Sequence, residues 1–406
     1  MTRTRPPLRL LFVLPAPVRI PMGGAAVVYR HAAGLAARGH EVTVAAPRSA
    51  GGAVGLARRG AVWARDRLHG VANAPYHEAA GVRTVEPASP GALDVRSHDA
   101  VIATGWQTAP WVAALTTPPR SPPRRPAPPV ASPPRPASRD VAPLRPPSFP
   151  ELGAWGGAGE TTRAEGGAVG LYFLQHDERH LSPRAEATWH LGLSNVAVAG
   201  WIADEVRAHG APVVGVVPNA VDPADVALDV PLAERAPRVV ALYHRLPVKG
   251  PDVLVEALGV LRDLVPGVGA DVVSARPPRH RLPEWVDLHV RPPRPALRAL
   301  YNRAAVCLHT SRVEGWGLVP MEAAACGCAV VATDSRGVSE FLRAGRSMRQ
   351  VPVGDAAGLA REAADLLRHA SRRVEIARAG VEDVARFSWA DSTERFEAIL
   401  RGAVGR

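Results

Sequence analysis

Two glutamates, Glu314 and Glu322, stand on either side of a short turn that contains Gly315 and Gly317. Glycine lets the backbone of such a turn approach a ligand more closely than a side chain would permit. The residues after the turn favour a short helix, and Gly327 is placed as the glycine that ends it. A helix N-terminus presents unpaired N–H groups and a partial positive charge, and it therefore binds phosphate well.

Carboxylates on both sides of a phosphate site suit a ligand that carries hydroxyl groups on both sides of its phosphates. A sugar nucleotide has this layout, because its sugar and its ribose flank a diphosphate. The apolar run at 329–333 predicts a buried strand, so the order along the chain is turn, helix and strand. An ordinary strand–loop–helix unit with two capping glutamates is the alternative that the glutamate pair leaves open.

Two cations, Arg245 and Lys249, follow an apolar segment at 238–243 that predicts the first strand of a second domain. A helix is expected directly after them, over 251–264, because leucines recur there at helical spacing. Each charge-assisted hydrogen bond from such a cation to a phosphate oxygen contributes about 1.5–3 kcal/mol. A solvated basic loop is the alternative interpretation of the same spacing.

The beginning of the chain predicts a strand at 8–14, a helix at 25–38 and a second strand at 41–46. This β–loop–α–β order is typical of an open parallel sheet. Gly23 and Gly24 stand in the loop before the helix, where they would let the backbone approach a phosphate. A plain tight turn explains two glycines equally well.

A further strand is expected over 168–175, and it ends in the sequence Gln-His-Asp-Glu. Ligands in open α/β sheets bind at the carboxyl ends of strands. A histidine beside acids at that position is therefore a better site candidate than a histidine elsewhere. We expect His176 or Asp177 to line a ligand-binding cleft.

The string Glu-Gly-Trp-Gly-Leu-x-Pro-x-Glu-Ala that begins at Glu314 resembles the nucleotide-sugar signature of family-4 retaining glycosyltransferases, which have the GT-B fold. Tyr-Phe-Leu-Gln-His-Asp-Glu, which ends at Glu178, is similar to a segment of members that build bacterial surface polysaccharides, including rhamnosyltransferase-like members. The resemblance implies that Glu314 faces the donor sugar and that Glu322 holds the ribose. It assigns donor contacts between them to Gly315, Trp316, Gly317 and Leu318. It also implies that His176 or Asp177 lines the acceptor side of the cleft.

The same resemblance implies further donor contacts and a hinge. Residues expected to meet the donor phosphates are Gly23, Gly24, Arg245 and Lys249. The pentad Pro-Asn-Ala-Val-Asp, which includes Asn219 and Asp222, resembles the family's Pro-Asn-Gly-Val-Asp hinge between domains. Ala220 stands where the family has glycine, which puts a positive-φ requirement there in doubt.

The fold implied is α/β GT-B, with two Rossmann-like domains whose parallel sheets face an interdomain cleft. The predicted units are an acceptor-side domain at 1–222, a linker at 223–237, a nucleotide-sugar domain at 238–386 and a crossover helix at 387–406. The helix is expected to cross back to the first domain. A tract rich in Pro and Arg, at about 117–167, predicts a disordered insertion within the first domain.

The function implied is transfer of a sugar from a nucleotide-sugar donor to a hydroxyl, with retention of configuration, in cell-surface polysaccharide or glycoconjugate synthesis. The acceptor is left open among a glycan, a lipid-linked molecule and a small molecule. Alternatives are a GT-B phosphorylase or epimerase, and a catalytically silent binding or scaffold protein. We expect no metal and no cofactor, because neither an Asp-x-Asp motif at a suitable strand end nor a His- or Cys-rich ligand set is present.

The 406 residues carry a formal net charge of +11, which could indicate nucleic acid as a partner. The cationic residues are scattered and form no patch interleaved with aromatic residues, so we expect no nucleic-acid binding. The 3 cysteines lie in or near apolar runs and indicate buried thiols of a cytoplasmic protein. No run approaches the roughly 20 apolar residues of a membrane span, and a peripheral contact with the inner membrane face is left open.

Overall fold

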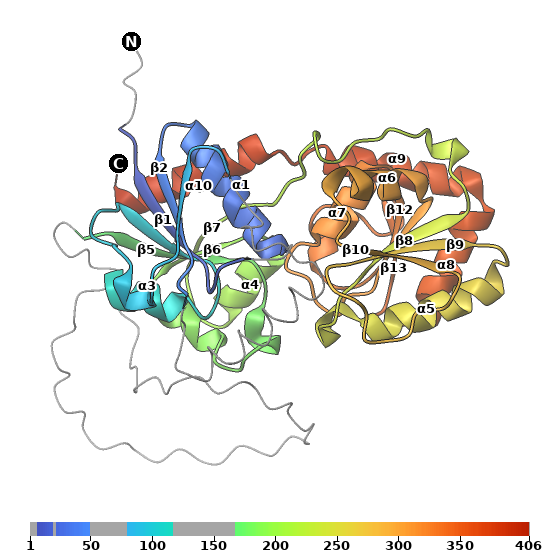
Figure 1. The fold of residues 1–406 in the computed structure, drawn as a ribbon, viewed down its shortest axis with the longest axis horizontal. Helices are drawn as coiled ribbons and strands as arrows, with labels where there is room; N and C mark the ends of the chain where they lie inside the picture. Colours follow the sequence, from blue (N-terminus) through green and yellow to red (C-terminus); the bar gives the residue numbers. More distant parts are fainter. Residues whose placement is uncertain (1–5, 19–21, 49–78, 117–166, 406) are drawn as a thin grey trace, which may run out of the picture.

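The computed structural model describes residues 6–18, 22–48, 79–116 and 167–405. They form two α/β domains side by side, each built on a parallel sheet, as Figure 1 shows. The prediction of two Rossmann-like domains is thereby confirmed. Nearly all of the Pro/Arg-rich tract predicted as a disordered insertion, at about 117–167, lies outside the described residues.

The N-terminal sheet has seven parallel strands in the order β3-β2-β1-β4-β5-β6-β7. The strands are β1 (Arg9–Val13), β2 (Glu41–Ala45), β3 (Val82–Val85), β4 (Ala100–Ala103), β5 (Val169–Leu174), β6 (Ser194–Ala197) and β7 (Val213–Val216). Strand β4 is apolar and buried at every position, as expected when helices cover both faces of a sheet. The strand order reverses between β1 and β4, and in open parallel sheets ligands bind at the carboxyl ends of strands at such a point.

The described part of this domain contains the helices α1 (Gly23–Ala37), α3 (Ala109–Thr116) and α4 (Gly200–Ala208), with short 3-10 turns η1 (Pro90–Ala92), η2 (Glu178–His180) and η3 (Glu186–His190). Helix α1 begins two residues earlier than the sequence predicts. Gly23 and Gly24 therefore form its first turn rather than the loop before it.

The C-terminal sheet has six parallel strands in the order β10-β9-β8-β11-β12-β13. The strands are β8 (Arg238–Tyr243), β9 (Gly269–Ser274), β10 (Val286–Val290), β11 (Val306–His309), β12 (Ala329–Thr333) and β13 (Met348–Val351). The helices and 3-10 turns are η4 (Leu232–Glu234), η5 (Pro247–Lys249), α5 (Pro251–Leu264), α6 (Arg294–Arg303), α7 (Leu318–Ala325), η6 (Gly337–Glu340), α8 (Ala356–Arg368) and α9 (Ala370–Val384). The leucine stripe predicted for α5 is fully buried at Leu254, Leu258 and Leu261.

The last helix, α10 (Trp389–Val404), returns to the N-terminal domain and packs against α1 (Figure 1). Ser388 caps it by accepting a hydrogen bond from the backbone N–H of Asp391. The ring centre of Phe396 lies 5.9 Å from that of Phe12 and 4.9 Å from that of Phe173. The predicted crossover is therefore present, and apolar contacts with the core of the first domain stabilise it.

The segment predicted as a hinge follows β7 and is bonded to helices α1 and α10. Asp222 pairs with Arg30 of α1 at 2.7 Å, and the carbonyl of Pro218 accepts a hydrogen bond from Ser392 of α10. Ala220 is buried and is not among the positive-φ residues, so alanine meets no strain where the family has glycine. Asn219 is also buried, and the hinge function of Asn219 and Asp222 stays a prediction.

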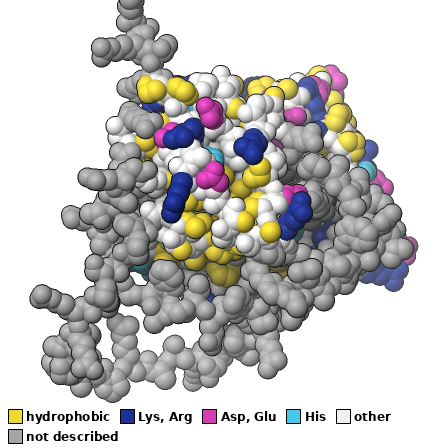
Figure 2. All heavy atoms as spheres, turned by 60° about the vertical axis from the view of Figure 1, so that its left-hand side comes forward, with side chains coloured by type: hydrophobic (Ala, Val, Ile, Leu, Met, Phe, Trp, Pro, Cys, Tyr) yellow, Lys and Arg dark blue, Asp and Glu magenta, His cyan; other side chains and the backbone are white. Residues whose placement is uncertain are grey.

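Figure 2 shows one face of the molecule, on which Lys and Arg side chains lie apart from one another among acidic and apolar side chains. On the described part of this face, positive charge therefore does not gather in one patch. Cys307, Cys326 and Cys328 are buried, and burial raises the pKa of Cys326 and of Cys328 to about 12. Every helix in the described ranges is too short or too polar to span a membrane.

His31 on α1 is packed against α10, and its burial there is expected to make the folded protein sensitive to acid. Its ring lies 5.3 Å from Trp389 and 5.1 Å from Phe396, and neither ring nitrogen has a partner among the described residues. Burial lowers the pKa of His31 from 6.5 to about 3. Between these values only the unfolded chain binds the proton, so folding stability falls as the pH falls from 6.5 towards 3.

We therefore expect His31→Leu to raise the free energy of unfolding at pH 5, relative to the wild type, by about 2 kcal/mol more than at pH 7.5. Urea denaturation at both pH values measures this difference. His190→Leu, at an exposed histidine, should leave the difference unchanged. Equal effects of His31→Leu at the two pH values would contradict the assignment.

Candidate active site

The centre of the candidate site is an ion pair between Lys249 and Glu314, two residues that the sequence singles out. Lys249 Nζ lies 2.7 Å from Glu314 Oε1 and 2.8 Å from Oε2, and Ser311 Oγ donates to Oε1 at 2.7 Å. Burial raises the pKa of Glu314, but Lys249 and the other nearby groups outweigh it and lower the pKa to about 2. The carboxylate is therefore ionised at neutral pH.

Neighbouring strands bring the two residues together. Lys249 follows β8 and Glu314 follows β11, and these strands pair in parallel, so their carboxyl ends meet at one edge of the sheet. Gly250 has a φ of 61°, and a Cβ there would lie 2.1 Å from the carbonyl oxygen of Thr310. Only glycine allows the loop after β8 to pack this closely against the loop after β11.

Residues 314–317, which we call the glycine loop, lead directly into helix α7. Gly317 occupies the N-cap position of α7 and has a φ of 100°. Because glycine has no side chain, the first N–H groups of α7 receive no hydrogen bond from a capping side chain. Trp316 is buried, and its indole N–H donates to Met321 Sδ at 3.1 Å. Its side chain thus anchors the loop, which leaves backbone groups to contact a ligand.

The turn after β5 of the first domain lies directly against the glycine loop. A Cβ on Gly315 would lie 2.0 Å from the carbonyl oxygen of Gln175 and 3.1 Å from the Cα of His176. From α1, a Cβ on Gly23 would lie 3.5 Å from Leu318 Cδ1, and one on Gly24 would lie 3.5 Å from Gln175 Oε1. The candidate site is therefore built between the two domains.

His176 has one free ring nitrogen in this interface. Its Nδ1–H donates to the carbonyl of Asp177 at 2.9 Å, and its buried Nε2 has no partner among the described residues. Burial, and next the charge of Lys249, lower the pKa of His176 to about 4. The imidazole is therefore neutral near pH 7, and Nε2 can accept a hydrogen bond from a hydroxyl.

Two predicted site residues direct their side chains elsewhere. The carboxylate of Asp177 caps η2 and pairs with Arg179 Nη2 at 2.8 Å. Arg245 Nε donates to the carbonyl of Pro277 at 2.9 Å. The structure thus brings Lys249 to the glycine loop but turns the Arg245 guanidinium towards a neighbouring loop.

Glu322 lies in the first half of α7, and its carboxylate is held by two residues of α6. Arg294 Nη1 donates to Oε1 at 2.9 Å, and Tyr301 Oη donates to Oε2 at 3.1 Å. Burial raises the pKa of Glu322, and Arg294 opposes that rise. Neither α6 residue carried a recognisable sequence signal, because both lie in an ordinary amphipathic helix.

Sequence reasoning also missed His309, which stands at the end of β11. Its Nε2 lies 3.7 Å from Glu314 Oε1, and burial lowers its pKa to about 4. The rule that singled out His176, a histidine at the carboxyl end of a strand, would have found it. Within the described part of the chain, no group of three or more His, Cys, Asp or Glu residues is placed to hold a metal ion, and metal independence stays a prediction.

These groups together can recognise a phosphorylated sugar. An ionised carboxylate accepts hydrogen bonds from hydroxyl groups, while a lysine and an uncapped helix N-terminus favour negative charge. A neutral imidazole completes the set from the opposite domain. The arrangement suits a ligand whose hydroxyl groups lie next to phosphates.

Comparison with known sequences finds similarity in the second domain. Residues 237–369 match the family model of glycosyl transferases group 1. A D-inositol 3-phosphate glycosyltransferase of Salinispora tropica is 35% identical over 170 residues, which cover 37% of this chain and 35% of that protein. The enzyme of the same name from Corynebacterium efficiens is 32% identical over 209 residues, covering 44% of this chain and 49% of that protein. The chain spans less than half of the length of these curated relatives.

Comparison with solved structures covers nearly the whole chain. Anabaena HepE in complex with UDP-glucose is similar with a TM-score of 0.66 at 16% identity, over 97% of this chain and 100% of that chain. Sucrose-phosphate synthase from Thermosynechococcus elongatus is similar with a TM-score of 0.68 at 14% identity, over 98% and 99%. The chain therefore has the GT-B fold, and its residues 237–369 match the model of the group 1 glycosyltransferases.

Proposed function

We propose that this protein is a retaining glycosyltransferase that moves a sugar from a nucleotide-sugar donor to an acceptor hydroxyl. The observation that carries the proposal is the pair of partly buried Lys249 and buried Glu314 beside the uncapped N-terminus of α7. The match of this domain to group 1 glycosyltransferases supports it. HepE, of similar fold, holds UDP-glucose, which makes a UDP-sugar the first donor to test.

Each residue of the site has a part in the proposed reaction. Lys249 and the N-terminus of α7 stabilise the charge that develops on the diphosphate as the glycosidic bond breaks. Glu314 accepts hydrogen bonds from hydroxyl groups of the donor sugar. The free Nε2 of His176 accepts a hydrogen bond from a donor or acceptor hydroxyl, and closure of the domains limits hydrolysis by excluding water.

The ribose is assigned to Glu322, whose carboxylate is already oriented by Arg294 and Tyr301. Ribose hydroxyl groups would donate to the same carboxylate. The leaving diphosphate needs no divalent ion in this scheme. Arg245 would contribute a second cation only after it leaves the carbonyl of Pro277.

The acceptor and the biological setting are part of the proposal. The names of the curated relatives specify D-inositol 3-phosphate, so a phosphorylated polyol is one acceptor to test. Glycans and lipid-linked acceptors are the others, in keeping with a role in surface polysaccharide or glycoconjugate synthesis. We place the reaction in the cytoplasm, with a peripheral membrane contact as one possible arrangement.

A screen of UDP-, GDP- and dTDP-sugars by thermal shift tests the proposal. At about 100 times its Kd, the correct donor is expected to raise the Tm by about 5 °C. Glu322→Gln should greatly reduce this shift, whereas Glu284→Gln, at an exposed glutamate of the same domain, should retain it. NMR of the product then gives its anomeric configuration, and retention is expected.

Analysis of the reaction products separates the alternatives. A phosphorylase would require free phosphate, and an epimerase would convert the donor without an acceptor. A scaffold protein would bind a sugar nucleotide without turning it over. Absence of binding to any sugar nucleotide would contradict the proposal itself.

A further inference from the structure

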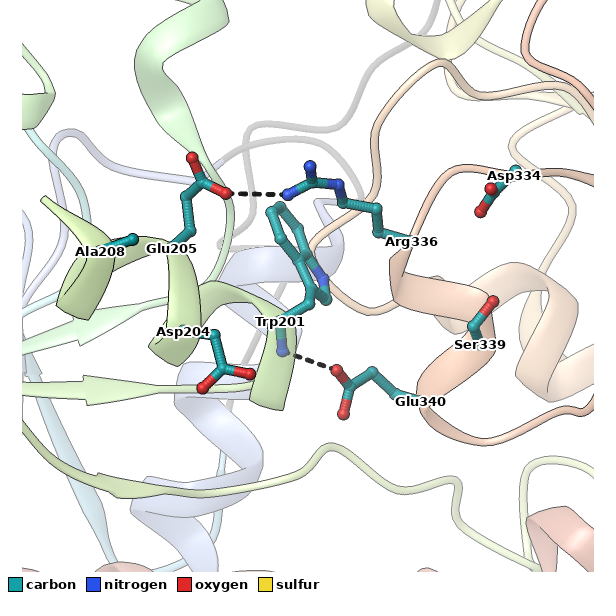
Figure 3. Close-up of a pocket in the computed structure, with 8 residues that line it drawn as sticks. All are labelled: Trp201, Asp204, Glu205, Ala208, Asp334, Arg336, Ser339 and Glu340. Atoms are coloured by element: carbon teal, nitrogen blue, oxygen red, sulfur yellow. Dashed lines mark hydrogen bonds and ion pairs between the residues drawn. The ribbon is translucent and has the colours of Figure 1, made fainter.

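Helix α4 of the first domain contacts the glycine loop of the second domain through one tryptophan. Trp201 lies in the first turn of α4, and its indole N–H donates to the carbonyl of Gly315 at 2.9 Å. Figure 3 shows the Trp201 ring beside Arg336 of the second domain, with Glu340 at the backbone N–H of Trp201. The carbonyl that receives this hydrogen bond belongs to the residue directly after Glu314.

The N-terminus of α4 is capped from the other domain. Ala199, at the N-cap position, has no side chain that could cap the helix. Instead Glu340 Oε1 accepts a hydrogen bond from the backbone N–H of Trp201 at 2.8 Å. A Cβ on Gly200 would lie 3.4 Å from both carboxylate oxygens, so the Glu340 carboxylate packs directly against the positive end of the helix.

Arg336 adds a third contact across the same boundary. Its guanidinium lies 5.2 Å from the ring centre of Trp201, and its Nη1 pairs with Glu205 of α4 at 2.9 Å. Arg336 also forms an isolated parallel β-bridge with Glu314. The segment that holds α4 is thus the same segment that braces the glycine loop.

We propose that Trp201, Arg336 and Glu340 form an interdomain clasp, in which Trp201 is a positioning residue for the donor. Closing the clasp brings the domains together and fixes the Gly315 carbonyl at the same time. The glycine loop would then reach its working conformation only in the closed protein. This inference rests on the proposed function for its catalytic part, whereas the clasp itself can be tested without any substrate.

The surroundings of the clasp allow it to open. It borders an open cavity of about 540 Å³ between the domains, lined also by Asp204, Asp334 and Ser339 (Figure 3). Its hydrogen bonds from Trp201 are only partly buried, and its ion pair between Arg336 and Glu205 is exposed, so water can replace these polar contacts when the clasp opens. A contact between domains that is polar and partly solvated is suited to repeated opening and closing.

Distance measurement between spin labels tests the clasp in the full-length protein without ligand. Labels at Ala187→Cys and Glu256→Cys place one probe on an exposed position of each domain, and the native cysteines are buried. The otherwise unchanged protein is expected to give a single short distance. Trp201→Ala and Glu340→Ala should each add a longer distance that accounts for at least half of the molecules.

Two further variants sharpen this test. Trp201→Phe keeps a ring beneath Arg336 but loses the indole N–H, so the distance should stay short. Asp204→Asn, on the same helix and 80% exposed at its side chain, should also leave it unchanged. An unaltered distance in both Trp201→Ala and Glu340→Ala, with melting temperatures that show folded protein, would overturn the clasp.

Kinetics with the donor identified by the screen test the positioning role separately. Trp201→Phe is expected to raise the KM for the donor about 5-fold while kcat stays within 2-fold. Trp201→Ala, which also loses closure, should lower kcat about 10-fold or more. Equal kinetics of Trp201→Phe and the wild type would overturn the positioning role, and failure of all donors to bind would count against the proposed function alone.

Discussion

Lys249→Met is expected to reduce transfer strongly and to lower the free energy of unfolding by about 3–5 kcal/mol. The substitution leaves the buried carboxylate of Glu314 without its lysine, and a buried charge without a partner is strongly destabilising. Loss of the cation also removes its stabilisation of the leaving diphosphate, so kcat should fall by about 100-fold or more.

The double variant Lys249→Met/Glu314→Gln separates folding from function. Removing both charges should restore most of the lost stability, because neither side chain is then left charged and unpaired. Transfer should stay strongly reduced. Urea denaturation and the transfer assay measure the two effects, with Arg281→Met as a control in an ion pair whose side chains are 87% and 89% exposed. Wild-type activity in the double variant would remove Lys249 and Glu314 from the mechanism.

Gly315→Ala is expected to reduce transfer by about 100-fold, with little change in the Tm. The added Cβ would lie 2.0 Å from the carbonyl oxygen of Gln175. A change of rotamer cannot relieve this clash, because the backbone fixes the position of both atoms. The domains must therefore separate or the glycine loop must shift. A displacement of about 1 Å near a reacting centre can cost about 100-fold in rate.

Gly259→Ala, on helix α5, is the matched control for this prediction. A Cβ there meets nothing within 4 Å, so alanine should stabilise the helix by about 0.5–1 kcal/mol and leave transfer unchanged. Steady-state kinetics and thermal denaturation of both variants give the comparison. A Gly315→Ala enzyme with unimpaired kinetics would show that the closed contact with Gln175 is not needed for transfer.

Much of the second domain could be predicted because its signals are local. Helix α7 begins at Leu318 and Gly327 has a φ of 84°, as a glycine that ends a helix requires. The proximity of Lys249 and Glu314 follows from parallel strands alone, since side chains after neighbouring strands share one edge of the sheet. These features depend on spacing within a few residues or on strand order.

Other features could not be predicted because they depend on packing between distant segments. Trp201 is 114 residues from Gly315, and no local pattern marks the indole as a partner of that carbonyl. Arg245 and Lys249 share one loop, yet only the lysine reaches Glu314, because the arginine finds the carbonyl of Pro277. Trp316 lies within the signature, yet its side chain is buried. The neighbouring residues in the sequence do not predict this burial.

Amide hydrogen exchange with and without a saturating sugar nucleotide tests most directly whether the glycine loop and Lys249 hold the donor. The account predicts slower exchange for amides of residues 315–322 and of the loop at 245–250, and a loss of this protection in Lys249→Met/Glu314→Gln. A sugar nucleotide that binds tightly while leaving exchange at both segments unchanged would contradict it.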